Sequence, residues 1–191
     1  NNTVIFENRD DDFDLNIRSL SPSNKAYNDS IQMFAKMIPQ VKDLRRVVPL
    51  PKPNNNSIVL WIQVNDICLL LGGDLEETKH PATGWSTIVN SKRRPKRKAK
   101  IFKIPHHGSE NGHSDEVWNQ MIDDSPVSLL TSKIGGGGGG IPKQRDLDRI
   151  KQYSDDLFCT GVPKGLKIKR EATVEKMFKS IVKARHILNG K

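Results

Sequence analysis

The sequence predicts a layered α/β domain. Short apolar runs typical of strands alternate with segments that repeat apolar residues at helical spacing, which indicates a sheet covered by helices. Of the 191 residues, 35% are hydrophobic and 28% are charged, a balance that supports an ordinary core in one domain or in a large part of one. The same composition excludes collagen-like, coiled-coil and disulfide-scaffold folds.

The expected elements follow from these patterns. Residues up to 12 end in an acidic run and are expected to form a loop, and the turn at 21–24 can cap the helix that follows it. Strands are expected at 14–20, 57–64, 67–71, 101–105, 127–130 and 157–160. Helices are expected at 27–38, 85–89, 114–122, 142–153 and 172–188. Residues 49–56 are predicted to be a connector, and six consecutive glycines at 135–140 predict a flexible linker, natural or engineered.

The positive charge of the chain is concentrated in one segment. Lysine and arginine total 31 against 22 aspartates and glutamates, a formal net charge of +9. Without the seven basic residues at 92–100 this charge falls to +2; they are Lys92, Arg93, Arg94, Lys96, Arg97, Lys98 and Lys100. Such localised charge predicts a docking patch for a polyanion, most simply nucleic acid.

The sequence contains few features that indicate a cellular compartment. No stretch approaches the roughly 18 apolar residues that a membrane helix needs, and the N-terminus carries no secretory signal pattern, so no membrane partner is expected. Cys68 and Cys159 each lie in an apolar run. They are expected to be small buried hydrophobes of a reduced, cytoplasmic protein, with one disulfide between them as the alternative.

A first candidate motif is the strand end Leu69-Leu70-Leu71-Gly72-Gly73-Asp74. Glycines let the backbone turn sharply and approach a ligand, and a carboxylate just beyond a buried strand points into a crevice. Asp is also a hard ligand able to bridge two divalent metals. The alternative, which the preference of Asp for N-caps favours for this motif taken alone, is that Asp74 caps a following helix.

The second motif is Lys103-Ile104-Pro105-His106-His107-Gly108-Ser109. Neighbouring side chains on an extended segment point opposite ways, so one histidine can reach a metal while the other meets substrate or a supporting partner. Imidazole suits zinc, iron or manganese. The alternative is a pair of surface histidines in a turn, but two of only five histidines occur here, which favours a functional pair.

The order of these motifs resembles the metallo-β-lactamase-fold hydrolases. Asn-Asn-Ser at 55–57, two apolar strands, Gly73-Asp74, a helix, a strand and Pro105-His106-His107-Gly108-Ser109 follow one another as in that family. The nearest branch is the hydrolase domain of bacterial DNA-uptake (competence) channel proteins. The resemblance covers 14–160 as a pattern, while its specific motifs are confined to 55–109.

This resemblance implies an αββα sandwich and a hydrolase with two divalent metals, zinc first and manganese as the alternative. Asp74 matches the bridging aspartate, and the His106-His107 pair matches the last metal-binding histidine. We expect His106 to be the ligand and His107 to contact substrate, with the opposite assignment open, and Ser109 to join in substrate binding. A hydroxide held between the metals would be the nucleophile.

The family's His-x-His-x-Asp-His signature is absent, as is its intervening metal-binding histidine; His80, His113 and His186 match neither. We therefore expect residues 1–191 to be the C-terminal part of such a domain, with the other half missing or on a partner chain, or a domain whose site is lost. By itself the chain is expected to be inactive.

These observations predict a phosphodiesterase or nuclease acting on DNA or RNA, with the basic segment 92–100 on a loop near the mouth of the site. No aromatic residue interleaves the segment, so sequence-specific reading is not indicated. The alternatives are a solvated charged loop, hydrolysis of another phosphoester, a lactone or a peptide, and a non-catalytic module that binds nucleic acid or a protein.

Overall fold

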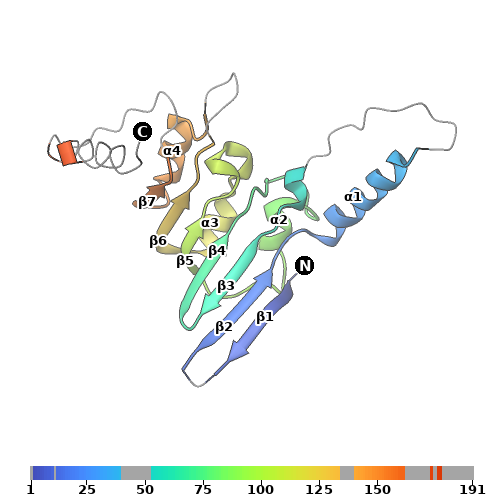
Figure 1. The fold of residues 1–191 in the computed structure, drawn as a ribbon, viewed down its shortest axis with the longest axis horizontal. Helices are drawn as coiled ribbons and strands as arrows, with labels where there is room; N and C mark the ends of the chain where they lie inside the picture. The colour runs from blue at the N-terminus through green and yellow to red at the C-terminus, as the bar shows by residue number, and fades with distance from the viewer. Residues whose placement is uncertain are drawn as a thin grey trace, which may run out of the picture.

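The computed structural model describes residues 2–10, 12–39, 53–133, 140–161, 173 and 176–177. Within these residues the strands form one seven-stranded sheet in chain order (Figure 1). Neighbours from β1 to β4 are antiparallel, and neighbours from β4 to β7 are parallel. The strands are β1 (Thr3–Arg9), β2 (Asp14–Ser19), β3 (Leu60–Val64), β4 (Ile67–Leu71), β5 (Ala99–Lys103), β6 (Ile122–Leu130) and β7 (Asp156–Cys159).

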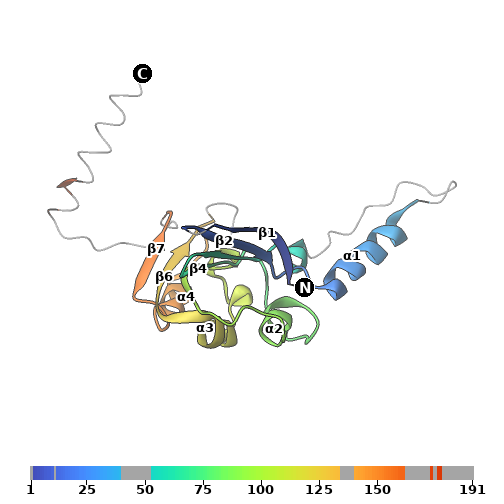
Figure 2. The ribbon, with the colours of Figure 1, turned by 90° about the horizontal axis from the view of Figure 1, so that it is seen from below.

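Helices cover one face of this sheet. Seen from below, α2, α3 and α4 lie on the same side of the strands, whereas α1 projects away from the sheet (Figure 2). The predicted α/β class is therefore confirmed. The α-helices in the described ranges are α1 (Asn24–Met37), α2 (Gly84–Val89), α3 (Asp115–Met121) and α4 (Gln144–Ile150), and the short 3₁₀ turns are η1 (Pro53–Asn56), η2 (His106–Gly108) and η3 (Glu110–Gly112).

The core lies between the sheet and these helices, on what we call the closed face. Trp61, Leu70 and Phe102 are register neighbours on β3, β4 and β5, and each is at most 2% exposed. The Phe102 ring packs edge-on against Trp118 of α3, with ring centroids 4.8 Å apart. Burial of these large apolar side chains drives the helices onto the sheet.

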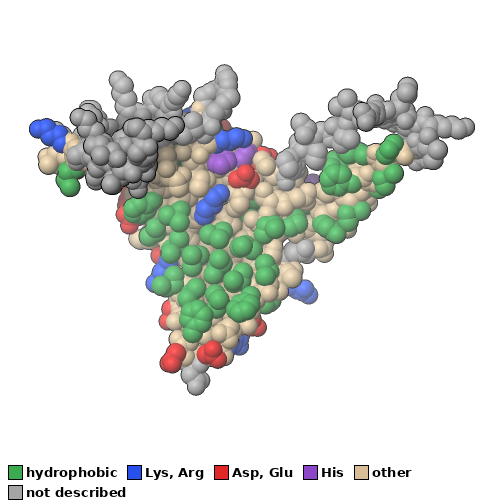
Figure 3. Space-filling model, in the orientation of Figure 1, with side chains coloured by type: hydrophobic (Ala, Val, Ile, Leu, Met, Phe, Trp, Pro, Cys, Tyr) green, Lys and Arg blue, Asp and Glu red, His purple; other side chains and the backbone are tan. Residues whose placement is uncertain are grey.

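The opposite face of the sheet, the open face, is also apolar. Because side chains alternate along a strand, the neighbours of the buried row point to this other side. All are half-buried or exposed. Figure 3 shows apolar side chains gathered over the strands on this face. The paired residues of β2 to β6 that form it are Leu15, Ile17, Ser19, Leu60, Ile62, Val64, Ile67, Leu69, Leu71, Ile101, Lys103, Val127 and Leu129.

Two sequence expectations are wrong. The expected N-terminal loop contains β1, which pairs with β2 through a bulge between Val4 and Phe6. Cys159 is exposed, although Cys68 is buried as expected, and both thiols are free. The capping turn is confirmed, since the Ser23 side chain accepts a hydrogen bond from the backbone of α1.

Two further expectations fall mainly outside the described residues. They are the linker at 135–140, of which only the last glycine is described, and the helix at 172–188, of which residues 173, 176 and 177 are described. Among the helices in the described ranges, none combines the length and apolar character needed to cross a membrane.

Candidate metal site at the strand ends

Asp74 lies just beyond the carboxyl end of β4, in a tight turn. The Gly72 N–H donates to the carbonyl oxygen of Lys103 at 3.0 Å, which ties the turn to the end of β5. Gly73 has a φ of +56°, and a Cβ there would lie 2.6 Å from a backbone oxygen, so the turn requires glycine. The next α-helix, α2, has Thr83 as its N-cap. The alternative that Asp74 caps the following helix is therefore wrong.

His106 and His107 lie directly beyond β5 in a turn of unusual backbone. Their φ angles are 46° and 54°, and Gly108 follows at 73°. Left-handed conformations cost a non-glycine residue on the order of 1 kcal/mol or more, and two in succession persist only when the surrounding structure enforces them. The Gly108 N–H donates to the Pro105 carbonyl at 2.9 Å and helps to hold the turn. Enforced strain of this kind clusters at functional sites.

This turn brings His107 beside Asp74. Nε2 of His107 lies 3.9 Å from Oδ2 of Asp74. Nδ1 of His107 is 2.9 Å from the carbonyl oxygen of Thr131, which can only accept, so the hydrogen-bond network assigns the proton to Nδ1. The lone pair of Nε2 is thereby left for a ligand. The Asp74 side chain is 43% exposed and that of His107 22% exposed, so both are accessible.

His106 belongs to a different cluster. Its Nε2 lies 3.2 Å from the Asn54 amide nitrogen, and its Nδ1 lies 3.4 Å from Oε1 of Glu76. Asn54 also donates to Glu76 at 2.8 Å. The rings of His106 and His107 are 6.4 Å apart between centroids. The geometry therefore favours His107 as the ligand, the assignment that the sequence left open, over His106.

Three residues of this site were not selected from the sequence. Asn54 donates to Nε2 of His106 and to Glu76, whose carboxylate lies 3.4 Å from Nδ1 of His106 without forming a hydrogen bond. Lys103 donates from Nζ to the Gly73 carbonyl at 2.8 Å. Burial lowers the pKa of Lys103, and the negative charge of Asp74 acts in the opposite direction. Lys103 is the first residue of the histidine motif, and Asn54 directly precedes the Asn-Asn-Ser motif, so these two motifs could have drawn attention to both residues. For Glu76 the sequence offers no such pattern except that it lies two residues after Asp74.

Ser109 does not reach Asp74 or His107. Its hydroxyl is buried and has no hydrogen-bond partner among the described residues. It lines a small cavity of about 10 Å³ within the core of the closed face, together with His113 and Arg149. The expected contact between Ser109 and substrate therefore has no support in this geometry.

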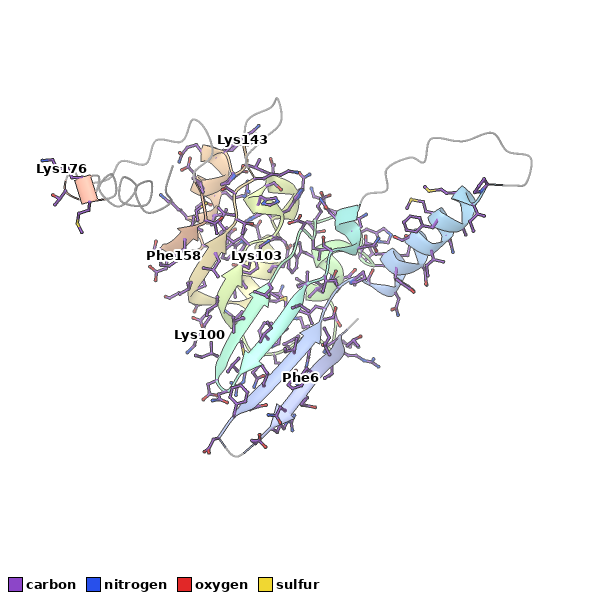
Figure 4. The ribbon with its side chains drawn as sticks, in the orientation of Figure 1. Phe6, Lys100, Lys103, Lys143, Phe158 and Lys176 are labelled. Carbon is purple, nitrogen blue, oxygen red and sulfur yellow. The ribbon has the colours of Figure 1, made fainter. Side chains whose placement is uncertain are left out.

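The basic segment 92–100 lies at the opposite end of the sheet. It leads into β5, whereas His107 follows that strand, and the parallel β4 likewise ends near His107. Figure 4 shows Lys100 and Lys103 towards opposite ends of β5. Arg97 pairs with Asp66 at 2.9 Å in the turn that precedes β4. Five strand residues span roughly 17 Å, so the predicted position near the mouth of the site is wrong. The binding role of the segment stays a prediction.

Asp74 and His107 offer the donor set of a zinc or manganese site. Two ligand atoms, each about 2.0–2.1 Å from a tetrahedral zinc, lie roughly 3.3 Å apart, so a small side-chain rotation closes the 3.9 Å separation. Within the described residues, however, no three His, Cys, Asp or Glu side chains are placed to hold a metal ion. The pair fits one part of a metal site and does not complete it.

The fold and the site define a mixed-sheet α/β protein whose neighbouring parallel strands end in a carboxylate and an imidazole. No protein-family model and no solved structure matches the chain. The chain is similar to ComE operon protein 3 of Bacillus subtilis (strain 168), with 29% identity over 127 residues. The alignment covers 63% of this chain and 15% of that protein, so the chain spans only a small part of its relative.

Proposed function

We propose that this chain is part of a metal-dependent hydrolase with a metallo-β-lactamase-like αββα sandwich, acting on phosphodiesters of DNA or RNA. The observation that carries the proposal is the pairing of Asp74 with His107 at the ends of neighbouring parallel strands, beside a strained turn. The resemblance of the motifs to the hydrolase domain of DNA-uptake channel proteins, and the similarity to ComE operon protein 3, support it.

In the proposed sandwich a second sheet covers the open face. Two apolar sheet faces pack about 10 Å apart, and each buried Å² of apolar surface contributes about 25 cal/mol. The second sheet would come from sequence outside the described residues or from a partner chain. The same layer would supply the metal ligands that Asp74 and His107 lack.

Each residue of the site then has a defined task. Asp74 would bind metal through its carboxylate and His107 through Nε2, which the hydrogen bond to Thr131 holds outward. When bound, divalent zinc or manganese would supply Lewis acidity and lower the pKa of water. Asn54, which also donates to Glu76, would hold His106 through Nε2 in place to contact substrate beside the pair. The basic segment 92–100 would dock the polyanion at a distance from the chemistry.

Two alternatives stand beside this proposal. Hydrolysis of a different phosphoester, a lactone or a peptide would use the same residues. A non-catalytic module that binds nucleic acid or protein is favoured by one observation, the incomplete ligand set among the described residues.

An Asp74→Asn substitution in the complete protein tests the metal assignment. We expect phosphodiester hydrolysis to fall by about 100-fold or more and the metal content to drop, with nucleic-acid binding retained. Asp148→Asn, on the exposed side of α4, makes the same chemical change away from the site and should leave both unchanged. Full turnover in Asp74→Asn would refute the assignment, and a metal-loaded wild type that hydrolyses no phosphodiester would favour the binding module.

A further inference from the structure

Lys103 is the single charged residue among the paired residues of β2 to β6 that form the open face. Its register neighbours are Leu71 on β4 and Leu129 on β6. The side chain is half-buried, and within the described part of the chain it forms no ion pair. The described carboxylate that acts on this charge is that of Asp74, itself a candidate metal ligand, so a substrate anion is the further partner that a lysine in an apolar row calls for.

The ammonium group of Lys103 lies next to the candidate metal ligands. Nζ donates to the carbonyl oxygen of Gly73, the residue before Asp74, at 2.8 Å. An ammonium group has three N–H donors, so two remain for a ligand. Figure 3 shows blue, red and purple side chains meeting at the border of the apolar surface, and Figure 4, in the same orientation, labels Lys103 on β5.

We propose that Lys103 is an anion-binding residue of this site, which holds a phosphate oxygen of the substrate beside Asp74 and His107. The inference rests on the proposed function and deepens it, because it assigns recognition of the substrate phosphate to one residue. Attraction between the ammonium group and a phosphate is stronger at a half-buried position than in water. A second sheet over the open face would bury the ammonium group further and make an anionic partner more necessary.

No other basic residue named in the site could take this role. The basic segment 92–100 lies at the other end of β5. Arg149 lies on the closed face, where it donates to the Gly108 carbonyl and to Asp146. The competing explanation is that Lys103 only ties the Gly73 turn to β5. The two roles can be distinguished. A structural link to Gly73 needs only a hydrogen-bond donor at position 103, whereas an anion site needs a positive charge there.

The experiment uses the complete protein and inorganic phosphate as the probe. Phosphate binding to the metal-free protein is measured by calorimetry, and phosphate inhibition of hydrolysis is measured on the metal-loaded protein. Lys103→Gln removes the charge but keeps a donor, Lys103→Arg keeps the charge, and Lys151→Gln removes a charge from the exposed end of α4, outside the site and the basic segment. We expect Lys103→Gln to weaken phosphate binding by about 10-fold or more, with metal content unchanged, and the other two variants to bind phosphate within about threefold of wild type.

The outcomes separate this inference from the proposed function. If Lys103→Gln binds phosphate as tightly as wild type, or if wild type binds none, the anion site is refuted even when hydrolysis is present. If phosphate binding depends on Lys103 but no phosphodiester is hydrolysed, the anion site stands and the hydrolase proposal fails. Should Lys103→Gln not fold, Lys103→Met and Lys103→Arg provide the comparison, and weak phosphate binding by a folded Lys103→Arg would refute the site.

Discussion

The two faces of the sheet have similar chemistry but different surroundings. On the closed face, Trp61, Leu70 and Phe102 are at most 2% exposed beneath helices that follow β4 in the sequence. On the open face, Ile67 is 48% exposed and Leu129 is 38% exposed. Successive residues of β3 and β4 are apolar and point to opposite faces, which makes both faces apolar, so the difference lies in what covers them. A continuous apolar face of this extent is typical of an interaction surface.

The largest expected effect tests whether the open face is a core in the complete protein. Leu69 lies between Ile62 and Ile101 on this face. If a second layer covers it, Leu69→Asp buries an unpaired charge and should lower the free energy of unfolding by about 3–5 kcal/mol. The measurement is the urea midpoint, with Leu69→Met as the volume-matched control. Equal midpoints for wild type and Leu69→Asp would mean that water covers this face.

A smaller effect is expected from neutralising the basic segment 92–100. Arg94 of this segment donates hydrogen bonds to Gln120 of α3, on the closed side of the sheet. We expect replacement of the residues whose side chains form neither an ion pair nor a hydrogen bond within the described part of the chain to weaken DNA binding and to flatten its salt dependence by about 0.9 per lost phosphate contact. The rate constant kcat should not change, because the segment is remote from Asp74. The residues to replace with glutamine are Lys92, Arg93, Lys96 and Lys100.

Fluorescence anisotropy across a salt series measures this change, with Lys151→Gln on the end of α4 as the control for loss of a single charge elsewhere. A salt slope that does not move would show that the segment is only a solvated loop. A fall in kcat at saturating DNA would instead place the segment close to the reacting groups, against the geometry.

The smallest expected effect is a pH dependence of the closed side. The pKa of His113 is lowered, mainly by burial and also by the positive charge of Arg149. The hydrogen bond to Asp115 and the negative charge of Glu110 act in the opposite direction. The folded protein therefore binds this proton more weakly than the unfolded chain, whose histidine has a pKa of about 6.5. The stability contribution is present above that pH and is lost as pH falls towards the folded pKa.

We expect Tm to fall by a few degrees between pH 7.5 and 5, and His113→Gln to reduce this fall. Asp115 remains ionised in this window, because hydrogen bonds from Tyr153 and then His113 lower its pKa. Calorimetry at several pH values provides the measurement. A pH profile of Tm that is the same in wild type and His113→Gln would contradict this account.

Most elements could be predicted because they depend on local spacing. The strand expected at 67–71 is β4, and the helix expected at 85–89 lies within α2. Strand β1 was missed because its apolar run, Val4 to Phe6, is only three residues long and is followed by polar residues, whereas the run of β4 fills the strand. A run this short gives a local pattern too little signal to indicate a strand, and its pairing with β2 is formed only in the tertiary structure.

The candidate site could be predicted in kind but not in detail. A carboxylate and an imidazole at the ends of neighbouring strands were expected to lie close together, and Asp74 and His107 do. The choice between His106 and His107 assumed an extended segment, whereas both residues are left-handed, so alternation does not apply to them. The direction of each ring depends on this tertiary turn.

The sequence by itself determined the residue types at the ends of β4 and β5 and the apolar character of both sheet faces, because motif chemistry and strand periodicity are local properties. Only the tertiary structure decided that His107 is the partner of Asp74, that Lys103 lies beside them, and that the basic segment lies at the far end of the sheet. These positions follow from the parallel register of β4 and β5, which brings together residues far apart in the chain. The pattern of apolar residues within each strand does not reveal this register.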